Sequence, residues 1–339
     1  MGEDRPANSS AAAPVANASI TVEEPLNSVA AAPEAEPLLV GTGFEWPGEG
    51  SAEEVRRQAG PYLLRIGRDG VGAQARPILE ISANEQTIRP DMSFYTPGSP
   101  LKISLIQNIQ GAVPVLLMQA FTGGAHCCVV AKLIGLSSGR LTVVDLGEWD
   151  GDTIPIPVDL SGDGVADFVF HDERFLYAFA SYASSIAPPR IYNATGGRIV
   201  EVSTRPEFRE LFERSMTAAA QECVSGSSGD DRNGACPAYV AAAARLNRAD
   251  EAWPRMLAAY DATTNWSLPT GCQIPALSGC PEGLQISYPN YPEALLHFLK
   301  DRGYLPPDWQ PPQASVLPGG GDVPAPATPP SGLSTQFSQ

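Results

Sequence analysis

The apolar residues of this chain change their spacing near Thr204, and this change constrains the fold more than any other feature. Before it, short apolar runs alternate with breaks that contain Gly, Pro and Asp, which is typical of strands separated by turns. After it, apolar residues recur at the three- and four-residue spacing of one helix face: Phe208, Leu211, Phe212 and Met216. A chain with strands first and helices second is predicted to fold as an α+β protein.

The same change divides the chain into predicted domains. We expect a β-rich domain over residues 38–203 and a small, disulfide-stapled helical domain over residues 204–305. The remaining segments, 1–37 and 306–339, are rich in Ala, Pro, Ser, Glu or Gly. Such segments bury too little apolar surface to offset the entropy of ordering them, so both ends are predicted to be disordered.

Local signals place the predicted helices. Thr204 and Glu207 have the spacing of a capping box, so the first helix is expected to begin there. After a polar loop, the second helix is expected to begin near Pro237, because proline suits the first turn of a helix. Asn290 is predicted to cap a last helix that ends before Gly303.

The charge balance bears on the partners that the chain can have. Its 22 Lys and Arg residues face 38 Asp and Glu residues, which gives a formal net charge of −16. Because a nucleic-acid surface needs a dense basic stripe and the sequence shows none, no nucleic-acid partner is expected. No apolar run approaches the roughly 18 residues needed to cross a bilayer, so no membrane span is expected.

Six cysteines bear on the cellular compartment. Four of them form two closely spaced pairs beside Gly, Pro or Asp residues: Cys223 with Cys236, and Cys272 with Cys280. An even count with short loops favours disulfides and an oxidising compartment, which predicts a periplasmic or extracellular protein. The alternative is a set of reduced core cysteines in a cytosolic protein.

The segment DLSGDGVADFVF, which begins at Asp159, has the alternating oxygen-bearing residues of a calcium loop. The predicted ligands are the side chains of Asp159, Ser161, Asp163 and Asp167 and the backbone carbonyl of Val165. Calcium is a hard cation that takes six to eight oxygen ligands, so a tight loop must aim several carboxylates inward. Gly164 supplies the sharp turn. The alternative is an ordinary Asp/Gly turn before a strand.

This loop resembles the calcium loops of FG-GAP and VCBS-type repeats, in which an Asp-x-Asn-Gly-Asp-Gly-x-x-Asp loop leads directly into a strand. Phe170 stands where an EF-hand has its bidentate Glu, so the resemblance is to the FG-GAP type. Ser161 departs from the pattern as a neutral and weaker ligand. Only one copy is present, and a full propeller needs about four or more blades, so none is expected.

A Gly-Gly-Ala-His-Cys-Cys segment contains His126, Cys127 and Cys128. Because neighbouring side chains of a strand point to opposite faces, only His126 and Cys128 would share a face for thiol catalysis or zinc binding. We favour a structural use of Cys127 and Cys128, bonded to each other or to another cysteine, over buried free thiols. The segment resembles one in poorly characterised exported bacterial proteins, and the resemblance implies no activity.

Two functions remain open at this point. The first is an exported calcium-binding structural or interaction protein with a protein or envelope partner, because calcium is the expected cofactor and no catalytic triad is recognisable. The second is a secreted hydrolase or thiol enzyme that uses Cys128 with His126, or a carboxylate pair near Asp150. The oligomeric state is not predicted.

Overall fold

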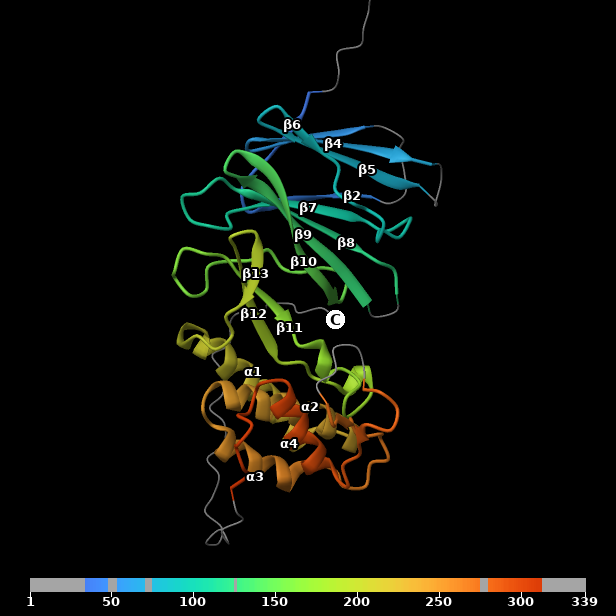
Figure 1. Ribbon diagram of the computed structural model, residues 1–339, viewed down its shortest axis with the longest axis vertical. Helices are drawn as coiled ribbons and strands as arrows, with labels where there is room; N and C mark the ends of the chain where they lie inside the picture. Colours follow the sequence, from blue (N-terminus) through green and yellow to red (C-terminus); the bar gives the residue numbers. More distant parts are fainter. Residues whose placement is uncertain (1–33, 48–53, 71–74, 125–126, 275–279, 313–339) are drawn as a thin grey trace, which may run out of the picture. The chain divides into compact units, whose positions relative to one another are not determined.

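The computed structural model describes residues 34–47, 54–70, 75–124, 127–274 and 280–312. From Ala35 onward, these residues belong to one compact unit (Figure 1). Most of the arm and of the tail for which disorder is predicted, residues 1–33 and 313–339, lies outside the described residues.

Two five-stranded sheets form the first part of the fold. The first has the order β1-β3-β4-β5-β6, with the strands Glu36–Leu38, Val55–Ala59, Tyr62–Asp69, Arg76–Ala83 and Gln86–Ile88. The second has the order β10-β9-β8-β7-β2, with the strands Arg140–Asp150, Cys127–Ser137, Val115–Phe121, Leu101–Ile106 and Thr42–Trp46. All pairings are antiparallel except that of β1 with β3. Tyr62 and Ile66 of the first sheet share one apolar core with Ile103 and Leu116 of the second.

A third, antiparallel sheet follows, in the order β11-β12-β13. Its strands are Asp167–His171, Pro189–Thr195 and Arg198–Glu201. A two-stranded sheet, β14 (Gly271–Cys272) with β15 (Gln285–Ile286), lies between the last two helices in the chain. Short 3₁₀ helices precede β12 at Glu173–Phe175 and Tyr182–Ser184.

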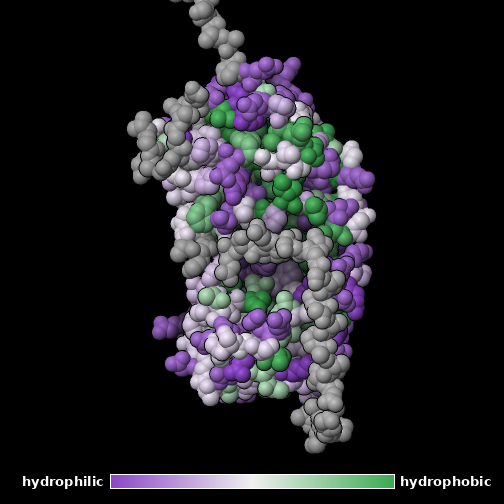
Figure 2. All heavy atoms as spheres, turned by 180° about the vertical axis from the view of Figure 1, so that it is seen from behind, coloured by the Kyte–Doolittle hydropathy of each residue, from purple (hydrophilic) through white to green (hydrophobic). Residues whose placement is uncertain are grey.

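Within the part of the chain that the structure describes there are four α-helices, and the predicted α+β class is confirmed. They are α1 (Arg209–Ser225), α2 (Gly229–Arg245), α3 (Ala249–Ala259) and α4 (Tyr291–Asp301). Phe175 and Phe179, which follow β11, pack against Phe298 of α4 in one apolar cluster with the helices. On the face shown in Figure 2, apolar residues gather over the β-sheets, whereas the helical part is mostly polar.

The predicted start of the first helix is wrong. A 3₁₀ turn begins at Pro206, and α1 begins only at Arg209, without a side-chain cap. The capping-box spacing at Thr204 is therefore not used, because the chain turns there at the end of β13 instead of entering a helix.

The second helix begins earlier than predicted, at Gly229, and contains Pro237 in its interior. Ser228 and Asp231 form a reciprocal capping box, which starts the helix within the segment expected to be a loop. Proline lacks the N–H that would bond the carbonyl of Asn233, four residues earlier. The hydroxyl of Tyr291 donates to that carbonyl at 2.7 Å, so a residue of α4 replaces the missing bond.

The predicted last helix is confirmed. The side chain of Asn290 accepts the backbone N–H of Glu293, and α4 ends at Asp301, before Gly303.

Candidate functional site

The Asp159–Asp167 loop joins a β-bridge at Val158 to the start of β11. A second bridge pairs Val165 with Ile109, in the turn that follows β7. Two backbone bonds fix this contact: Gln110 N–H to Gly164 carbonyl at 2.7 Å, and Ala166 N–H to Asn108 carbonyl at 2.8 Å. The loop is therefore held by a segment about 50 residues earlier in the chain, a contact that its own sequence does not indicate.

The carboxylate of Asp159 organises the first half of the loop. Its Oδ1 accepts the N–H of Gly162 at 2.7 Å, and its Oδ2 accepts the N–H of Gly164 at 2.9 Å. Both glycines have positive φ angles, 77° and 84°, which other residues adopt only with strain. The hydroxyl of Ser161 donates to the same carboxylate at 3.3 Å.

Asp167 closes the loop from its other end and is only 1% exposed. Its Oδ2 accepts the N–H groups of Leu160 and Ser161 at 2.8 and 3.0 Å. Its Oδ1 accepts the amide of Asn193 on β12 at 2.7 Å. A buried carboxylate with three donors is well satisfied, so Asp167 fastens the loop to the third sheet.

The carboxylate of Asp163 has other partners. Its Oδ1 accepts the N–H of Val165 at 2.9 Å, and its Oδ2 forms an ion pair with Arg205 at 2.7 Å. The Val165 N–H, together with Ser161 and Arg205, holds the pKa of Asp163 below its ordinary value. Sequence reasoning missed Arg205, which lies 42 residues beyond Asp163 and belongs to no motif.

The predicted ligands thus meet only in part. Asp159, Ser161 and Asp167 are joined to one another by the hydrogen bonds above, whereas Asp163 is paired with Arg205. Across the described ranges, no three His, Cys, Asp or Glu side chains are arranged to hold a metal ion. The loop therefore brings three of the predicted ligands together, whereas one carboxylate oxygen of Asp163 is engaged by Arg205.

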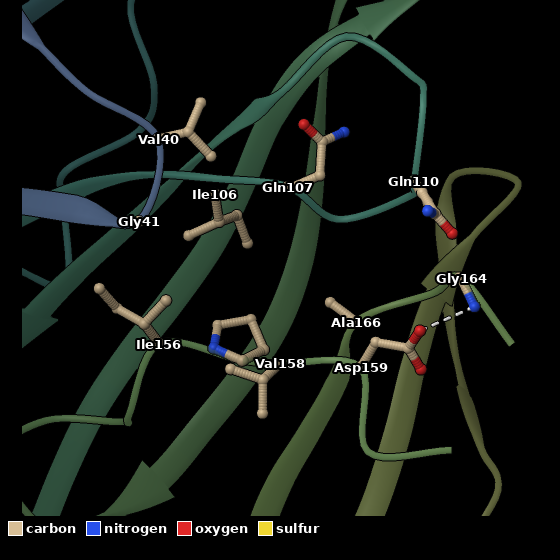
Figure 3. A pocket seen from close by; sticks show the side chains of 11 residues that line it. Val40, Gly41, Ile106, Gln107, Gln110, Ile156, Val158, Asp159, Gly164 and Ala166 are labelled. Carbon is tan, nitrogen blue, oxygen red and sulfur yellow. Dashed lines mark hydrogen bonds between the residues drawn. The ribbon is translucent and has the colours of Figure 1, made fainter. Parts of the chain in front are cut away.

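A pocket of about 600 Å³ adjoins the loop (Figure 3). Most of its lining is apolar, and two glutamines and Asp159 supply the polar side chains. It is lined by Val40, Gly41, Ile106, Gln107, Gln110, Ile156, Pro157, Val158, Asp159, Gly164 and Ala166. The bond between Asp159 and the Gly164 N–H lies in its wall, so pocket and loop share residues.

A second cluster of ionisable groups surrounds Asp150 at the end of β10. Tyr182 donates its hydroxyl to Asp150 at 2.7 Å, and this bond, together with burial, raises the pKa of Tyr182 to about 12. The backbone N–H of Asp150 donates to the carboxylate of Glu173. Burial raises the pKa of Glu173, and the charges of Asp150 and Glu148 add to the effect. Sequence reasoning expected a carboxylate pair near Asp150 without naming Glu173.

The Gly-Gly-Ala-His-Cys-Cys segment is only partly described. His126 and the side chain of Cys127 lie outside the described residues. Cys128 is 4% exposed and disulfide-bonded, so it offers no thiolate for nucleophilic catalysis. Asp150 lies opposite Cys127 in the β9–β10 ladder, which brings this segment close to the Asp150 cluster.

Disulfides are confirmed as a feature of the chain. Cys223 at the end of α1 is bonded to Cys236 in α2, and both side chains are fully buried. Cys272 of β14 is bonded to Cys280. Within the residues described, we find no helix that combines the length and the apolar character needed to span a membrane.

The first comparison with known proteins concerns the helical part of the chain. Residues 212–303, which cover most of α1 and all of α2 to α4, match the family described as the sll0997 C-terminal domain. No solved structure matches the chain.

Two relatives extend the comparison beyond the helices. The chain is 35% identical over 216 residues to the "Probable thylakoid lumen protein sll0997" of Synechocystis sp. (strain ATCC 27184 / PCC 6803 / Kazusa). The match covers 61% of this chain and 62% of that protein. It is 31% identical over 197 residues to the "Uncharacterized protein y4bJ" of Sinorhizobium fredii (strain NBRC 101917 / NGR234), covering 58% of this chain and 31% of the relative. The chain therefore spans less than two thirds of either relative.

Proposed function

We propose that this chain is an exported structural or interaction protein of a compartment outside the cytoplasm, and that its Asp159–Asp167 loop binds calcium. Two observations support the compartment. Disulfides persist in oxidising compartments and are rare in the cytosol. A relative that matches 61% of the chain is named as a probable thylakoid lumen protein.

The observation that carries the calcium proposal is the contact between the two ends of the loop. Ser161 donates its hydroxyl to Asp159 and its N–H to Asp167, so three oxygen-bearing side chains already lie together. Each carboxylate oxygen has two lone pairs, and an N–H donor occupies only one of them. The oxygens of Asp159, Ser161, Asp163 and Asp167 and the Val165 carbonyl would hold the ion.

Calcium would act here by ordering the loop, not by chemistry. The loop contains three carboxylates, and only Asp163 has an arginine partner among the bonds described above. A bound cation would offset the repulsion between these charges and strengthen the attachment of β11. The role expected of the ion is therefore structural support of the β-region.

Calorimetric titration and thermal melts of the full chain with calcium and with magnesium test this proposal. Calcium at a hundredfold excess over Kd stabilises the folded state by about 2.7 kcal/mol, which raises the melting temperature by several degrees. Magnesium should do much less, because it demands a tighter octahedral site. No response to calcium at about millimolar concentration, the level of extracellular sites, would refute calcium binding.

The matched variants are Asp163→Asn and Asp91→Asn. Both aspartates are exposed and accept the N–H two residues ahead, at 2.9 Å in each case. Only Asp163 belongs to the loop, so Asp163→Asn should abolish the calcium response and Asp91→Asn should leave it unchanged. Equal responses in both variants would place the calcium elsewhere.

A second candidate function is a secreted hydrolase that uses Asp150 and Glu173. The specific observation in its favour is the bond from the backbone N–H of Asp150 to the carboxylate of Glu173, whose pKa is raised mainly by burial. A carboxyl whose pKa is raised by burial is the usual form of a general acid. A panel of chromogenic glycosides and esters tests it: activity that Glu173→Gln abolishes supports this function, and no turnover of the panel counts against it.

A further inference from the structure

The pocket beside the loop has the size of a small-molecule site. Its volume of about 600 Å³ lies within the range of roughly 300–1,000 Å³ that is usual for ligand pockets. Its walls come from separate parts of the chain: Val40 before β2, Ile106 at the end of β7, Ile156 and Val158 before the loop, and Ala166 within it. Figure 3 shows these apolar side chains around a common space.

Exposed apolar side chains continue beyond the pocket. Six large ones line the pocket or directly adjoin a lining residue in sequence: Leu39, Val40, Ile109, Ile156, Val158 and Leu160. Their exposed fractions range from 37% to 67%. Three of them, Val40, Ile156 and Val158, line the pocket itself, so the pocket presents exposed apolar surface to a ligand.

The polar groups of the pocket restrict the charge of the ligand. Among the described residues of the lining, Asp159 is the one that is ionisable, and its carboxylate disfavours an anionic group. Gln107 and Gln110 contribute amides, and the Nε2 of Gln107 is already committed to the carbonyls of Ile109 and Ala112. The carbonyl oxygen of Gln107 can therefore accept a hydrogen bond from a neutral or cationic donor.

Two prolines argue against a polypeptide strand as the occupant. Pro155 and Pro157 alternate with Ile154, Ile156 and Val158 in sequence. The last three residues of this segment, Ile156, Pro157 and Val158, line the pocket. Since proline has no N–H to donate, this segment cannot form a regular ladder with an added strand. The pocket thus suits a compact molecule better than β-strand addition.

We propose that this pocket binds a small, mainly apolar organic molecule that carries a neutral or cationic hydrogen-bond donor. The proposal does not depend on calcium, although pocket and loop share Asp159 and Gly164. Its failure and that of calcium binding are therefore separable, because each titration is run with calcium and with a chelator.

The probe is N-phenyl-1-naphthylamine, a neutral aromatic amine, titrated by fluorescence into the full chain. We expect saturable binding at one site per chain, both with calcium and with the chelator. Ile156→Glu places a charge in the apolar wall and should weaken binding by about tenfold or more. Val143→Glu is the matched control, because Val143 is similarly exposed, at 44% against 37%, but lies on β10 outside the lining.

Several outcomes would overturn the proposal. They are the absence of saturation, equal weakening by both variants with unchanged melting temperatures, and equally tight binding of the anionic 1-anilinonaphthalene-8-sulfonate. A further contradicting outcome would come from sedimentation velocity. A dimer that Ile156→Glu dissociates and Val143→Glu does not would make this surface an interface between two copies. An unchanged monomer with selective loss of the probe in Ile156→Glu supports the small-molecule site.

Discussion

Tyr304 donates a hydrogen bond of 3.1 Å to the carboxylate of Asp172, which lies 132 positions earlier in the chain. Asp172 is 1% exposed and also accepts two bonds from the guanidinium of Arg174, at 2.7 and 2.5 Å. Burial alone would raise the pKa of Asp172, but the bonds and charge of Arg174, with Arg190 and Tyr304, hold it below its ordinary value. The contact connects the segment after β11 to the segment after α4.

Tyr304→Phe should lower the free energy of unfolding by about 1.5 to 3 kcal/mol, since a hydrogen bond to a buried charged group is lost. Urea unfolding measures this change. Tyr177→Phe is the control, because Tyr177 is 52% exposed and should change stability by less than about 0.5 kcal/mol. Equal effects of both variants would show that the Asp172 bond contributes nothing of its own.

Gly234 allows α2 to approach the 3₁₀ turn at Tyr182–Ser184. A β-carbon on Gly234 would lie 2.0 Å from the carbonyl oxygen of Ser184, so the two elements would have to separate. Gly234→Ala should therefore destabilise the fold by about 1 to 3 kcal/mol or more, although alanine favours a helix by up to about 1 kcal/mol over glycine.

Thermal and urea unfolding check this prediction. Gly67→Ala on β4 is the control, because a β-carbon there meets no atom within 4 Å. A Gly234→Ala variant that is as stable as the parent would mean that the turn moves without cost.

Glu173 and Glu201 should show opposite pH dependences. The pKa of Glu173 is raised, mainly by burial, so the folded state favours its protonated form. Stability is then lost as pH rises from the unfolded-state pKa through this raised pKa, so Glu173→Gln should become more stable relative to the parent over that rise. The variant keeps an oxygen that can accept the Asp150 N–H.

The pH dependence of the stability that Glu201 contributes has the opposite sign. Burial would raise its pKa, but hydrogen bonds from Arg190 and Ser203 hold it below the ordinary value. Its contribution is present above the unfolded-state pKa and is lost as pH falls, so Glu201→Gln should be most destabilising near about pH 7. Urea unfolding midpoints of the parent and both variants, measured from about pH 4 to about pH 7, test the two signs. Parallel pH profiles of Glu173→Gln and Glu201→Gln would contradict the assigned pKa directions of both residues.

The Cys223–Cys236 disulfide should be the more important of the two described bonds for stability. It closes the larger loop, with a sequence separation of 13 against 8, and lies in the buried contact of α1 with α2. Replacing both cysteines with alanine should cost about 2 to 5 kcal/mol.

Replacing Cys272 and Cys280 in the same way should cost less. Alkylation of the native protein followed by mass spectrometry should leave all four cysteines unlabelled. Quantitative labelling of these four cysteines would show that they are reduced and would contradict the proposed oxidising compartment.

Short-range signals explain what could be predicted. The change from runs and turns to a helical period placed strands before helices, and Asn290 with Glu293 located the start of α4. Two close cysteine spacings corresponded to the two described disulfides. In the Asp159 loop, the alternation of Asp, Ser and Gly predicted the tight turn that precedes β11.

The same short-range reasoning failed where two signals competed. The spacing of Thr204 and Glu207 is that of a capping box, but Thr204 lies in the turn between β13 and the 3₁₀ helix that begins at Pro206. Pro237 suits the first turn of a helix, but Ser228 with Asp231 caps α2, which begins eight residues before Pro237 at Gly229. In both cases the residue at which the helix begins depended on neighbouring residues outside the local pattern.

The sequence by itself determined the fold class and the turn chemistry of the loop, because both depend on residues within a few positions of one another. Only the tertiary structure decided the partners of the buried and charged groups: Arg205 for Asp163, Tyr291 for the helix carbonyl that Pro237 leaves open, and Tyr304 for Asp172. These partners are 42 to 132 positions apart. Such pairs arise because a group removed from water must be satisfied by whichever donor or acceptor the packed chain brings within about 3 Å.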